Sequence, residues 1–241
     1  MDPFSTEGVA AFRETFRREQ IPRGYRGELH ALFLTAVPGA AIAYAVSRLD
    51  HPRWTDFLVL LPLMLLGSLV VWTVHKFPLH RPMGPLRPIY KIHSLQHHRF
   101  FTDEVTEYES PRDFAIVFFP WFTPVTVVLL QMPAFYLGAR ALGASENLAL
   151  IVSLINPIYY LLYELFHFAS HVPASSLLLR VPFLRAMREH HRIHHDPHLM
   201  ARYNFNVVIP ICDWILGTYV GSREEAARLS AASKAAAEKA G

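Results

Sequence analysis

Four long stretches with almost no charge constrain this chain more than any other feature. They cover residues 29–49, 54–74, 114–138 and 147–171. Each is long enough to cross a bilayer, which takes about 20 residues in a helix. Each also contains at least one proline, which membrane helices tolerate far better than water-soluble helices do. The pattern predicts an all-α membrane protein with about four transmembrane helices.

The composition agrees with this fold class and limits the chemistry. Of the 241 residues, 52% are hydrophobic and only 18% are charged. The formal charge of +3 does not indicate a basic surface that would bind nucleic acid. Cys212 is the only cysteine, so one chain cannot build a disulfide framework, a cysteine-rich zinc site or a cysteine-ligated iron–sulfur cluster. Any bound metal must therefore be held by histidines and carboxylates.

The basic residues predict how the chain crosses the membrane. Residues 1–28 form a polar, arginine-rich arm, and the segments after the second and fourth stretches are also basic. The two short loops on the other side contain only Arg48, Arg53 and Arg140. Basic loops stay on the cytoplasmic side, so both termini and the long central loop are expected there. We expect one membrane-embedded domain over residues 29–220, a charged alanine-rich tail over 221–241, and a bacterial inner membrane as the location.

Twelve of the 14 histidines fall in four groups with short internal spacing. The groups are H-x4-H, H-x3-H-H, H-x3-H and H-x2-H-H, formed by His75 and His80; His93, His97 and His98; His167 and His171; and His191, His194 and His195, with His190 and His198 flanking the last. The first group follows the second predicted span and the third group ends the fourth span. All four groups are therefore expected at one membrane face, in a cytoplasmic helical cap.

The spacings favour metal binding. Side chains three or four residues apart share a helix face, which brings together the histidines within three of the groups. His75 and His80 do not align on a regular helix, and we expect Pro78 and Pro82 to break the helix and let both turn inward. Neutral imidazole suits iron, zinc, copper and nickel. Ten such ligands are too many for one ion, so two ions with about five each are predicted.

These motifs resemble those of the fatty acid hydroxylase/sterol desaturase superfamily of membrane di-iron proteins. The stretch Tyr203–Asn206 and the stretch Asp213–Thr218 are similar to the end of that superfamily's pattern, and the likeness runs from about residue 29 to 220. The resemblance implies two irons, dioxygen as cosubstrate and oxidation of a lipid-like substrate. The implied metal ligands are His75, His80, His93, His97, His98, His167, His171, His191, His194 and His195.

Two details depart from the commonest hydroxylase pattern. Three residues separate His93 from His97, where many hydroxylases of the superfamily have two, so this group also looks like the broader desaturase and alkane-hydroxylase pattern. The fourth group carries the additional His190 and His198, which could replace a neighbour as ligand or orient one.

Two carboxylates are the candidate catalytic residues. Glu164 lies deep in an apolar span, one helical turn before His167, where a charge is costly and usually functional. Asp196 directly follows His195 and is expected to orient the histidines in a similar way. Asn204 and Asn206 are expected to cap a helix, contact metal-bound water or order the cap, and Asp213 to be structural.

The leading hypothesis is a dioxygen-dependent membrane hydroxylase. A desaturase or ketolase would use the same metal core, and a zinc-dependent hydrolase or isomerase is a more distant alternative, with zinc possible in the purified protein. A metal transporter is disfavoured because the histidines gather at one face. The chain contains no dinucleotide-binding or haem motif, so an external donor, such as a ferredoxin or cytochrome with its reductase, is expected to supply electrons.

Overall fold

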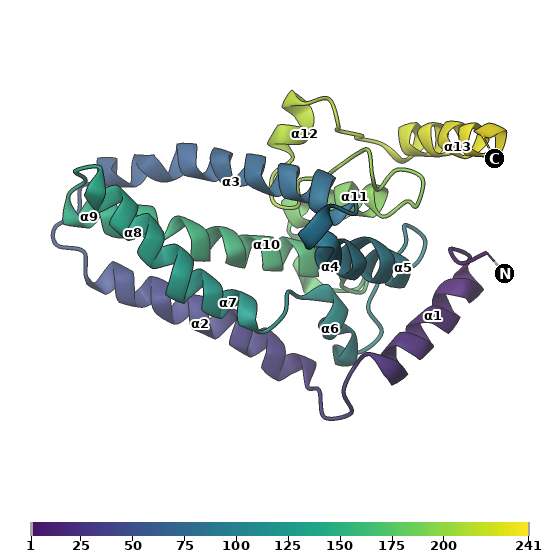
Figure 1. Cartoon of the computed structure of the whole chain (residues 1–241), viewed down its shortest axis with the longest axis horizontal. Helices are drawn as coiled ribbons and strands as arrows, with labels where there is room; N and C mark the ends of the chain where they lie inside the picture. Colours follow the sequence, from purple (N-terminus) through teal and green to yellow (C-terminus); the bar gives the residue numbers. More distant parts are fainter. Residues whose placement is uncertain (1, 241) are drawn as a thin grey trace. The chain divides into compact units, whose positions relative to one another are not determined.

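The structure, a computed structural model, describes residues 2–240, and all regular secondary structure among them is helical (Figure 1). No strand occurs among those residues. Four helical stretches are long and apolar enough to cross a membrane: Gly27–Ser47, Trp54–Leu79, Phe122–Ala141 and Glu146–His171. The predicted all-α membrane fold with about four spans is thereby confirmed.

The α-helices differ greatly in length, from single turns to 21 residues. They are α1 (Thr6–Glu19), α2 (Gly27–Ser47), α3 (Leu60–Val74), α4 (Arg87–Tyr90), α5 (His98–Phe100), α6 (Phe114–Val117), α7 (Phe122–Thr126), α8 (Met132–Ala141), α9 (Glu146–Ser153), α10 (Ile155–His171), α11 (Pro182–His194), α12 (Ile211–Ile215) and α13 (Arg223–Ala240). Wider π-helical segments η2 (His75–Leu79), η4 (Lys91–His97) and η6 (Val127–Gln131) continue α3, α4 and α7. Tighter 3₁₀ turns cover Trp54–Val59, Gly84–Leu86, Pro111–Asp113 and Leu177–Arg180.

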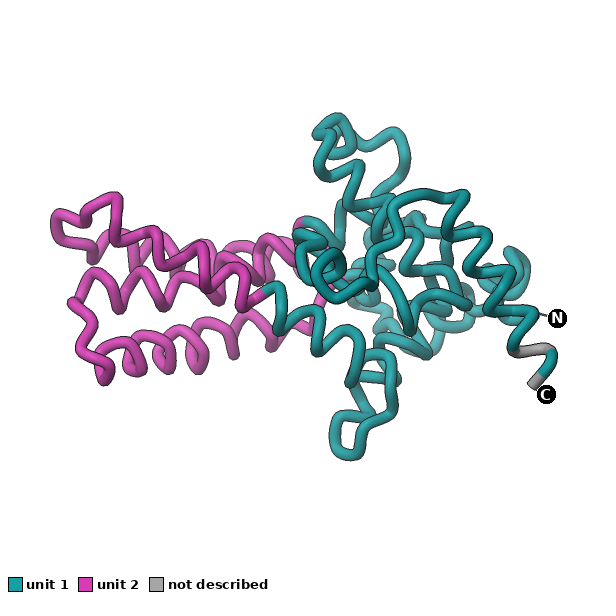
Figure 2. Tube along the Cα trace, turned by 90° about the horizontal axis from the view of Figure 1, so that it is seen from above, with its two compact units in different colours: residues 1–25, 68–117, 166–241 teal, residues 26–67, 118–165 magenta. Residues whose placement is uncertain are grey.

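The chain divides into two compact units, coloured separately in Figure 2. Unit 1 comprises Met1–Tyr25, Ser68–Val117 and Phe166–Gly241, and unit 2 comprises Arg26–Gly67 and Phe118–Leu165. All ten histidines of the four groups belong to unit 1. Unit 2 contains most of the apolar helical length.

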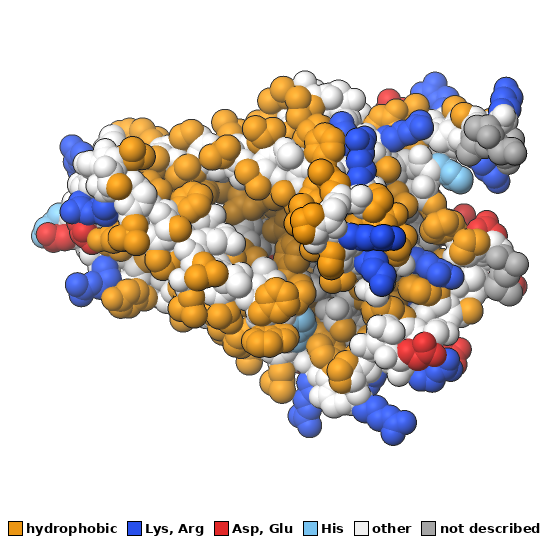
Figure 3. Space-filling view, viewed as in Figure 1, with side chains coloured by type: hydrophobic (Ala, Val, Ile, Leu, Met, Phe, Trp, Pro, Cys, Tyr) orange, Lys and Arg blue, Asp and Glu red, His pale blue; other side chains and the backbone are white. Residues whose placement is uncertain are grey.

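The helices of unit 2 expose hydrophobic side chains, as membrane spans must. Leu32 on α2, Leu61 on α3 and Leu137 on α8 are each more than half exposed. Hydrophobic side chains cover much of the visible face of these three helices in Figure 3. Water would penalise such a surface, whereas lipid chains solvate it at no cost.

The third span begins later than the sequence pattern predicts. The expected span starts at residue 114, but the structure forms the short α6 there and starts the candidate span at Phe122. Pro120 explains the interruption, because proline lacks an N–H and disfavours helix at Phe119 before it. The freed N–H of Phe119 instead donates to the Glu164 carboxylate at 3.2 Å.

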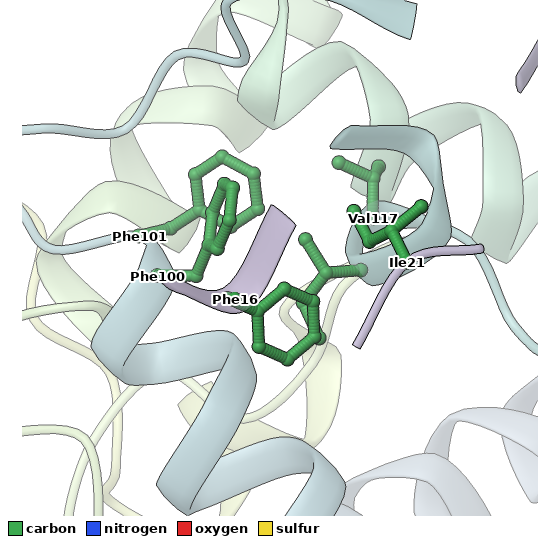
Figure 4. Close-up of a cluster of buried hydrophobic side chains, with 6 residues drawn as sticks. Phe16, Ile21, Phe100, Phe101 and Val117 are labelled. Carbon is green, nitrogen blue, oxygen red and sulfur yellow. The ribbon is translucent and has the colours of Figure 1, made fainter. Parts of the chain in front are cut away.

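Helix α1 packs into the core of unit 1 rather than forming a solvated arm. Phe16 contacts a buried cluster with Phe100 and Phe101, and Ile21 and Val117 belong to the same cluster (Figure 4). The side chain of Arg13 is also buried and donates to the carbonyl oxygens of Phe100 at 2.7 Å and Val105 at 2.9 Å. The N-terminal helix therefore fixes the segment that directly follows the second histidine group.

Candidate metal centre

The ten histidines converge in unit 1 as two buried sets. In the first set, His75, His80, His93, His98 and His194 place one ring nitrogen each within 4.8 Å of all the others. In the second set, His97, His167, His171 and His191 do the same. Every one of these side chains is buried, and His98, His171 and His194 have no exposed surface at all.

His195 brings the second set to five. Its Nε2 atom lies 3.2 Å from Nε2 of His97 and 3.0 Å from Nε2 of His191. Its ring also stacks on His98, a member of the first set, with a centroid distance of 4.3 Å. The two sets thus adjoin one another, with five imidazoles in each, which is the count that the number of histidines suggests.

The π-helical segments determine which histidines meet. A π-helix has a wider turn than an α-helix, so side chains five residues apart come closer to one face. His75 and His80, which flank η2, stack at 5.2 Å between ring centroids, and Nε2 of His93 lies 3.1 Å from Nε2 of His98. The expected break does not occur at Pro78, which lies inside η2, but the helix ends at Leu79, before Pro82, and both histidines turn inward as expected.

The pairing within the second histidine group also differs from the α-helical expectation. His93 and His97 are four residues apart and were expected to face the same ion. The structure instead assigns His93 to the first set and His97 to the second. The wider winding of η4 turns residue i+5 toward the face of residue i, which brings His98 beside His93. The His97 ring stacks on His93 with a centroid distance of 5.4 Å, but its Nε2 lies 3.2 Å from Nε2 of both His167 and His195.

Backbone carbonyls determine the tautomer of several rings. Nδ1 of His97 lies 2.9 Å from the carbonyl oxygen of Ile116, and Nδ1 of His195 lies 2.7 Å from that of Phe101. A carbonyl oxygen only accepts, so the proton of each neutral ring must be on Nδ1. Three further rings make the same contact: His75 with Phe205, His171 with Thr106 and His194 with Tyr203. Nε2 of each ring is therefore an unprotonated lone pair.

These lone pairs face one another, which tests whether the site fits a metal. The Nε2 atoms of His97 and His195 are 3.2 Å apart, and neither carries a proton to share. His80 and His194 show the same conflict at 3.1 Å, because Ser94 donates to Leu79 and so accepts from Nδ1 of His80. A cation between the rings resolves the repulsion and uses every lone pair. The donor sets therefore fit two metal ions.

Burial keeps the imidazoles neutral, as metal ligands must be. It lowers the pKa of His97 to about 4, although a hydrogen bond to Ile116 opposes the shift. Burial, followed by repulsion from neighbouring imidazoles, also holds the pKa of His98, His191 and His195 well below the usual value of a histidine. At neutral pH these rings thus carry lone pairs and no charge.

A polar network supports the loop that supplies two of the carbonyls. Asp213 is fully buried and accepts from the N–H groups of Phe205 and Asn206 at 2.9 and 2.8 Å, and from the hydroxyl of Thr218 at 2.7 Å. Asn204 adopts a left-handed backbone (φ 58°), and its side chain donates to the carbonyl oxygens of His190 and Val220. This network holds the Tyr203 and Phe205 carbonyls against His194 and His75.

The two candidate catalytic carboxylates lie outside both histidine sets. Oε1 of Glu164 accepts from the Tyr160 hydroxyl at 2.9 Å, whereas Oε2 is buried without a hydrogen-bond partner among the described residues. Asp196 accepts from the backbone N–H of His198 at 2.7 Å, which is a local turn contact.

Neither additional histidine belongs to one of the two histidine sets found among the described residues. His190 is buried with Nε2 at 3.3 Å from the Asp213 carboxylate, and His198 is exposed. No sequence signal marks the carbonyls that orient the rings, because every residue has one.

The comparisons with known proteins agree with the geometry. The fatty acid hydroxylase family matches residues 60–218, which is more than half of the chain and includes all ten histidines. The chain belongs to the fatty acid hydroxylase family. Neither the curated proteins nor the solved structures provide a match. The protein is therefore a multi-helix membrane oxidoreductase of hydroxylase or desaturase type, with two buried histidine clusters typical of a metal centre.

Proposed function

We propose that this protein is a di-iron membrane monooxygenase that hydroxylates a C–H bond of a lipid or similar hydrophobic substrate. The observation that carries the proposal is the pair of five-imidazole sets whose lone pairs face one another. Bound iron would supply the redox chemistry that activates dioxygen, which zinc cannot. The net reaction consumes substrate, dioxygen, two electrons and two protons, and yields the alcohol and water.

Residues around the two histidine sets fix the orientation of the rings and exclude water from them. Carbonyls of Phe101, Thr106 and Ile116 accept from Nδ1 of three rings of the second set, which fixes ring orientation and directs Nε2 inward. Phe100, Phe101 and Phe205 have no exposed surface, so aromatic side chains exclude water from the neighbourhood of the histidines.

Glu164 is the residue that we propose to handle a proton. It is buried in a membrane-spanning helix one turn before His167, and its Oε2 atom has no hydrogen-bond partner in the part of the chain that the structure describes. A buried carboxyl group held by Tyr160 and Phe119 can donate or accept a proton without changing position. Asp196 is assigned the lesser role of shaping the turn after His195.

The first experiment measures the metal content of detergent-purified protein from iron-supplied cells, beside the His194→Ala/His195→Ala variant. Each substitution removes a ligand from a different set, so we expect about two irons per chain in the native protein and a large loss in the variant. Zinc alone, in protein prepared without air and with iron in excess, would contradict the proposal and favour a hydrolase or isomerase.

Product analysis then separates the alternatives that share the metal core. Membrane lipids of cells expressing the protein are compared with those of cells expressing the double variant, with ¹⁸O-labelled dioxygen supplied. A labelled alcohol supports the hydroxylase. A new alkene or ketone identifies a desaturase or ketolase, and an unlabelled product contradicts oxygen insertion.

A further inference from the structure

A cleft in unit 1 lies beside the second histidine set and is rich in arginine. Its volume is about 830 Å³, and it is formed by the loop after the second histidine group, the segment after α10, and α11. Six arginines line it: Arg13, Arg180, Arg185, Arg188, Arg192 and Arg223. The positive-inside rule predicts basic residues in this part of the chain, but it does not require six arginines to line one cleft.

Ion pairing inside the cleft leaves it positive. Arg13 pairs with Glu109, Arg188 with Glu107 and Arg223 with Glu189, each at 2.9 Å or less. The remaining acidic residue of the lining is Glu104. Three guanidinium groups, those of Arg180, Arg185 and Arg192, have no ion-pair partner among the described residues.

Two of those guanidinium groups are fully available. Arg180 and Arg185 are exposed, and neither side chain has an ion pair or hydrogen bond with another residue in the described part of the chain. Arg192 donates its Nε–H to the carbonyl oxygen of Asp103, and no carboxylate of the described residues lies within ion-pair distance of it. The cleft therefore presents unused donors suited to an anionic partner.

Helix α11 connects the cleft to the metal centre. Arg185, Arg188 and Arg192 recur at intervals of three and four residues and line the cleft. His191, His194 and His195, from the same stretch, belong to the histidine sets. A partner bound to the side of α11 that carries these arginines is therefore separated from the histidines by about the diameter of one helix.

A thin loop closes the cleft against the histidines. Thr106 lines the cleft, and its carbonyl oxygen accepts from Nδ1 of His171 at 2.8 Å. Thr106 and Phe101 are buried, and His171 has no exposed surface, so no atom of a bound partner can pass. Electron transfer does not need direct contact, because the hydrogen bond between Thr106 and His171 connects the cleft to the second histidine set.

We propose that this cleft is where a small acidic one-electron carrier protein docks and that electrons enter the centre through Thr106 and His171. The inference rests on the proposed function, which requires two electrons per turnover from outside the chain. Each encounter oxidises the carrier by one electron and reduces the metal centre by one. Two encounters, with two protons from solvent, supply the reduction of the second oxygen atom of dioxygen to water.

The test uses the charge-reversal variant Arg180→Glu/Arg185→Glu in full-length, iron-loaded protein in detergent. Its matched control is Arg87→Glu/Arg228→Glu, which changes the charge equally at two exposed arginines outside the cleft. The probes are an acidic [2Fe–2S] ferredoxin and a soluble cytochrome b5 domain. Binding is measured by titration at low and high salt, and reduction of the centre is followed by stopped-flow, with dithionite as a carrier-independent reductant.

The expected result is salt-sensitive binding of at least one carrier to the native protein and to the control. Binding and carrier-driven reduction should fall by at least about tenfold in the cleft variant, because reversing charges on a docking face removes electrostatic attraction. Metal content and reduction by dithionite should be unchanged. If the cleft variant loses both its metal and its reduction by dithionite, the substitutions have damaged the metal centre itself. The milder variant Arg185→Gln is then used to repeat the binding and reduction measurements.

Three outcomes would overturn the inference. The first is that neither carrier binds the native protein. The second is that the cleft variant binds the carrier and is reduced by it as the native protein is. The third is that the control variant loses carrier binding as much as the cleft variant does. If dithionite reduces the centre normally and the cleft variants have no effect on carrier-driven reduction, the docking site is rejected and the proposed function is not affected. A protein that holds no redox-active metal rejects the proposed function first, and the electron-entry role with it.

Discussion

At the scale of the residue, function depends on which nitrogen of each imidazole carries the proton. Five rings donate Nδ1–H to backbone carbonyls and so turn a lone pair on Nε2 toward the neighbouring rings. A carbonyl acceptor cannot be removed by substitution, so the most informative substitutions are those of the rings themselves.

His98→Ala is the cleanest test of the two-set arrangement. Nδ1 of His98 has no hydrogen-bond partner within the described part of the chain, so removal of this ring leaves no buried carbonyl there unsatisfied. We expect the metal content to fall from about two ions per chain to about one, because only the first set loses a ligand. Elemental analysis measures this, with the exposed His198→Ala as control. Unchanged metal content at both sites would contradict the assignment of His98.

Glu164→Gln separates a chemical role from a structural one. Glutamine keeps an acceptor for the Tyr160 hydroxyl and the Phe119 N–H but cannot carry the proton. We expect turnover to fall by about 10²-fold with metal content retained, the usual size of general acid–base catalysis. The control is Glu146→Gln, which has the same contact with a tyrosine, Tyr136, at an exposed site. Equal activities of the two variants would refute a proton-handling role.

At the scale of the element, two segments hold the centre from outside. The loop Tyr203–Asn206 supplies the carbonyls for His194 and His75, and α1 holds the segment around Phe100. Neither segment contains a ligand, yet both determine where ligands lie. Each can be tested by one substitution of the side chain that anchors it.

Asp213→Asn should loosen the loop that orients the first set. The carboxylate accepts three hydrogen bonds from Phe205, Asn206 and Thr218, and an amide would present N–H groups to one or more of these donors. We expect a loss of about 2–4 kcal/mol in stability, the range for breaking a buried network. Thermal unfolding and the rate of metal loss to a chelator both report it, with the exposed Asp50→Asn as control. A destabilised variant with unchanged metal loss would mean that Asp213 does not act on the centre.

Arg13→Ala tests whether α1 is part of the functional unit. The guanidinium group satisfies the buried carbonyls of Phe100 and Val105 and pairs with Glu109, so its loss leaves acceptors unpaired. We expect stability to drop by about 3 kcal/mol, with Arg13→Lys recovering only part because an ammonium lacks the planar fork. Thermal unfolding checks this against Arg18→Ala, an exposed position on the same helix. Equal melting temperatures of the Arg13→Ala and Arg18→Ala variants would show that the contacts of Arg13 do not stabilise the protein.

At the scale of the whole molecule, the four candidate spans and the charge pattern make a topological prediction. The loop around Asp50 is poor in basic residues, whereas the segments near both termini and the histidines are rich in them. The positive-inside rule therefore assigns the histidine end to the cytoplasm.

Cysteine labelling tests that orientation directly. Cys212 is buried, so exposed cysteines introduced as Asp50→Cys and Glu224→Cys supply the reactive thiols. We expect a membrane-impermeant maleimide to label Asp50→Cys in intact cells, and Glu224→Cys only after the membrane is opened. The reverse pattern would invert the topology and exclude a cytoplasmic electron donor.

Much of the fold and the candidate site follows from local sequence. Apolar stretches of about 20 residues predict spans because a bilayer core has a definite thickness. Histidine spacing pairs His167 with His171 correctly, and the number of rings suggests two ions, but the spacing does not predict how the second and fourth groups divide between the two sets. The family likeness also rests on these same short motifs, which the match over residues 60–218 confirms.

Only the tertiary structure decides how the ten rings are divided. The π-helical winding of η4 brings His98 beside His93, whereas His97 joins the other set, and no local pattern distinguishes a π-turn from an α-turn. The carbonyls of Phe101 and Thr106 orient His195 and His171 through contacts 94 and 65 residues apart in the chain. Such contacts depend on how distant segments pack, whereas membrane spans and ligand types are properties of each segment alone.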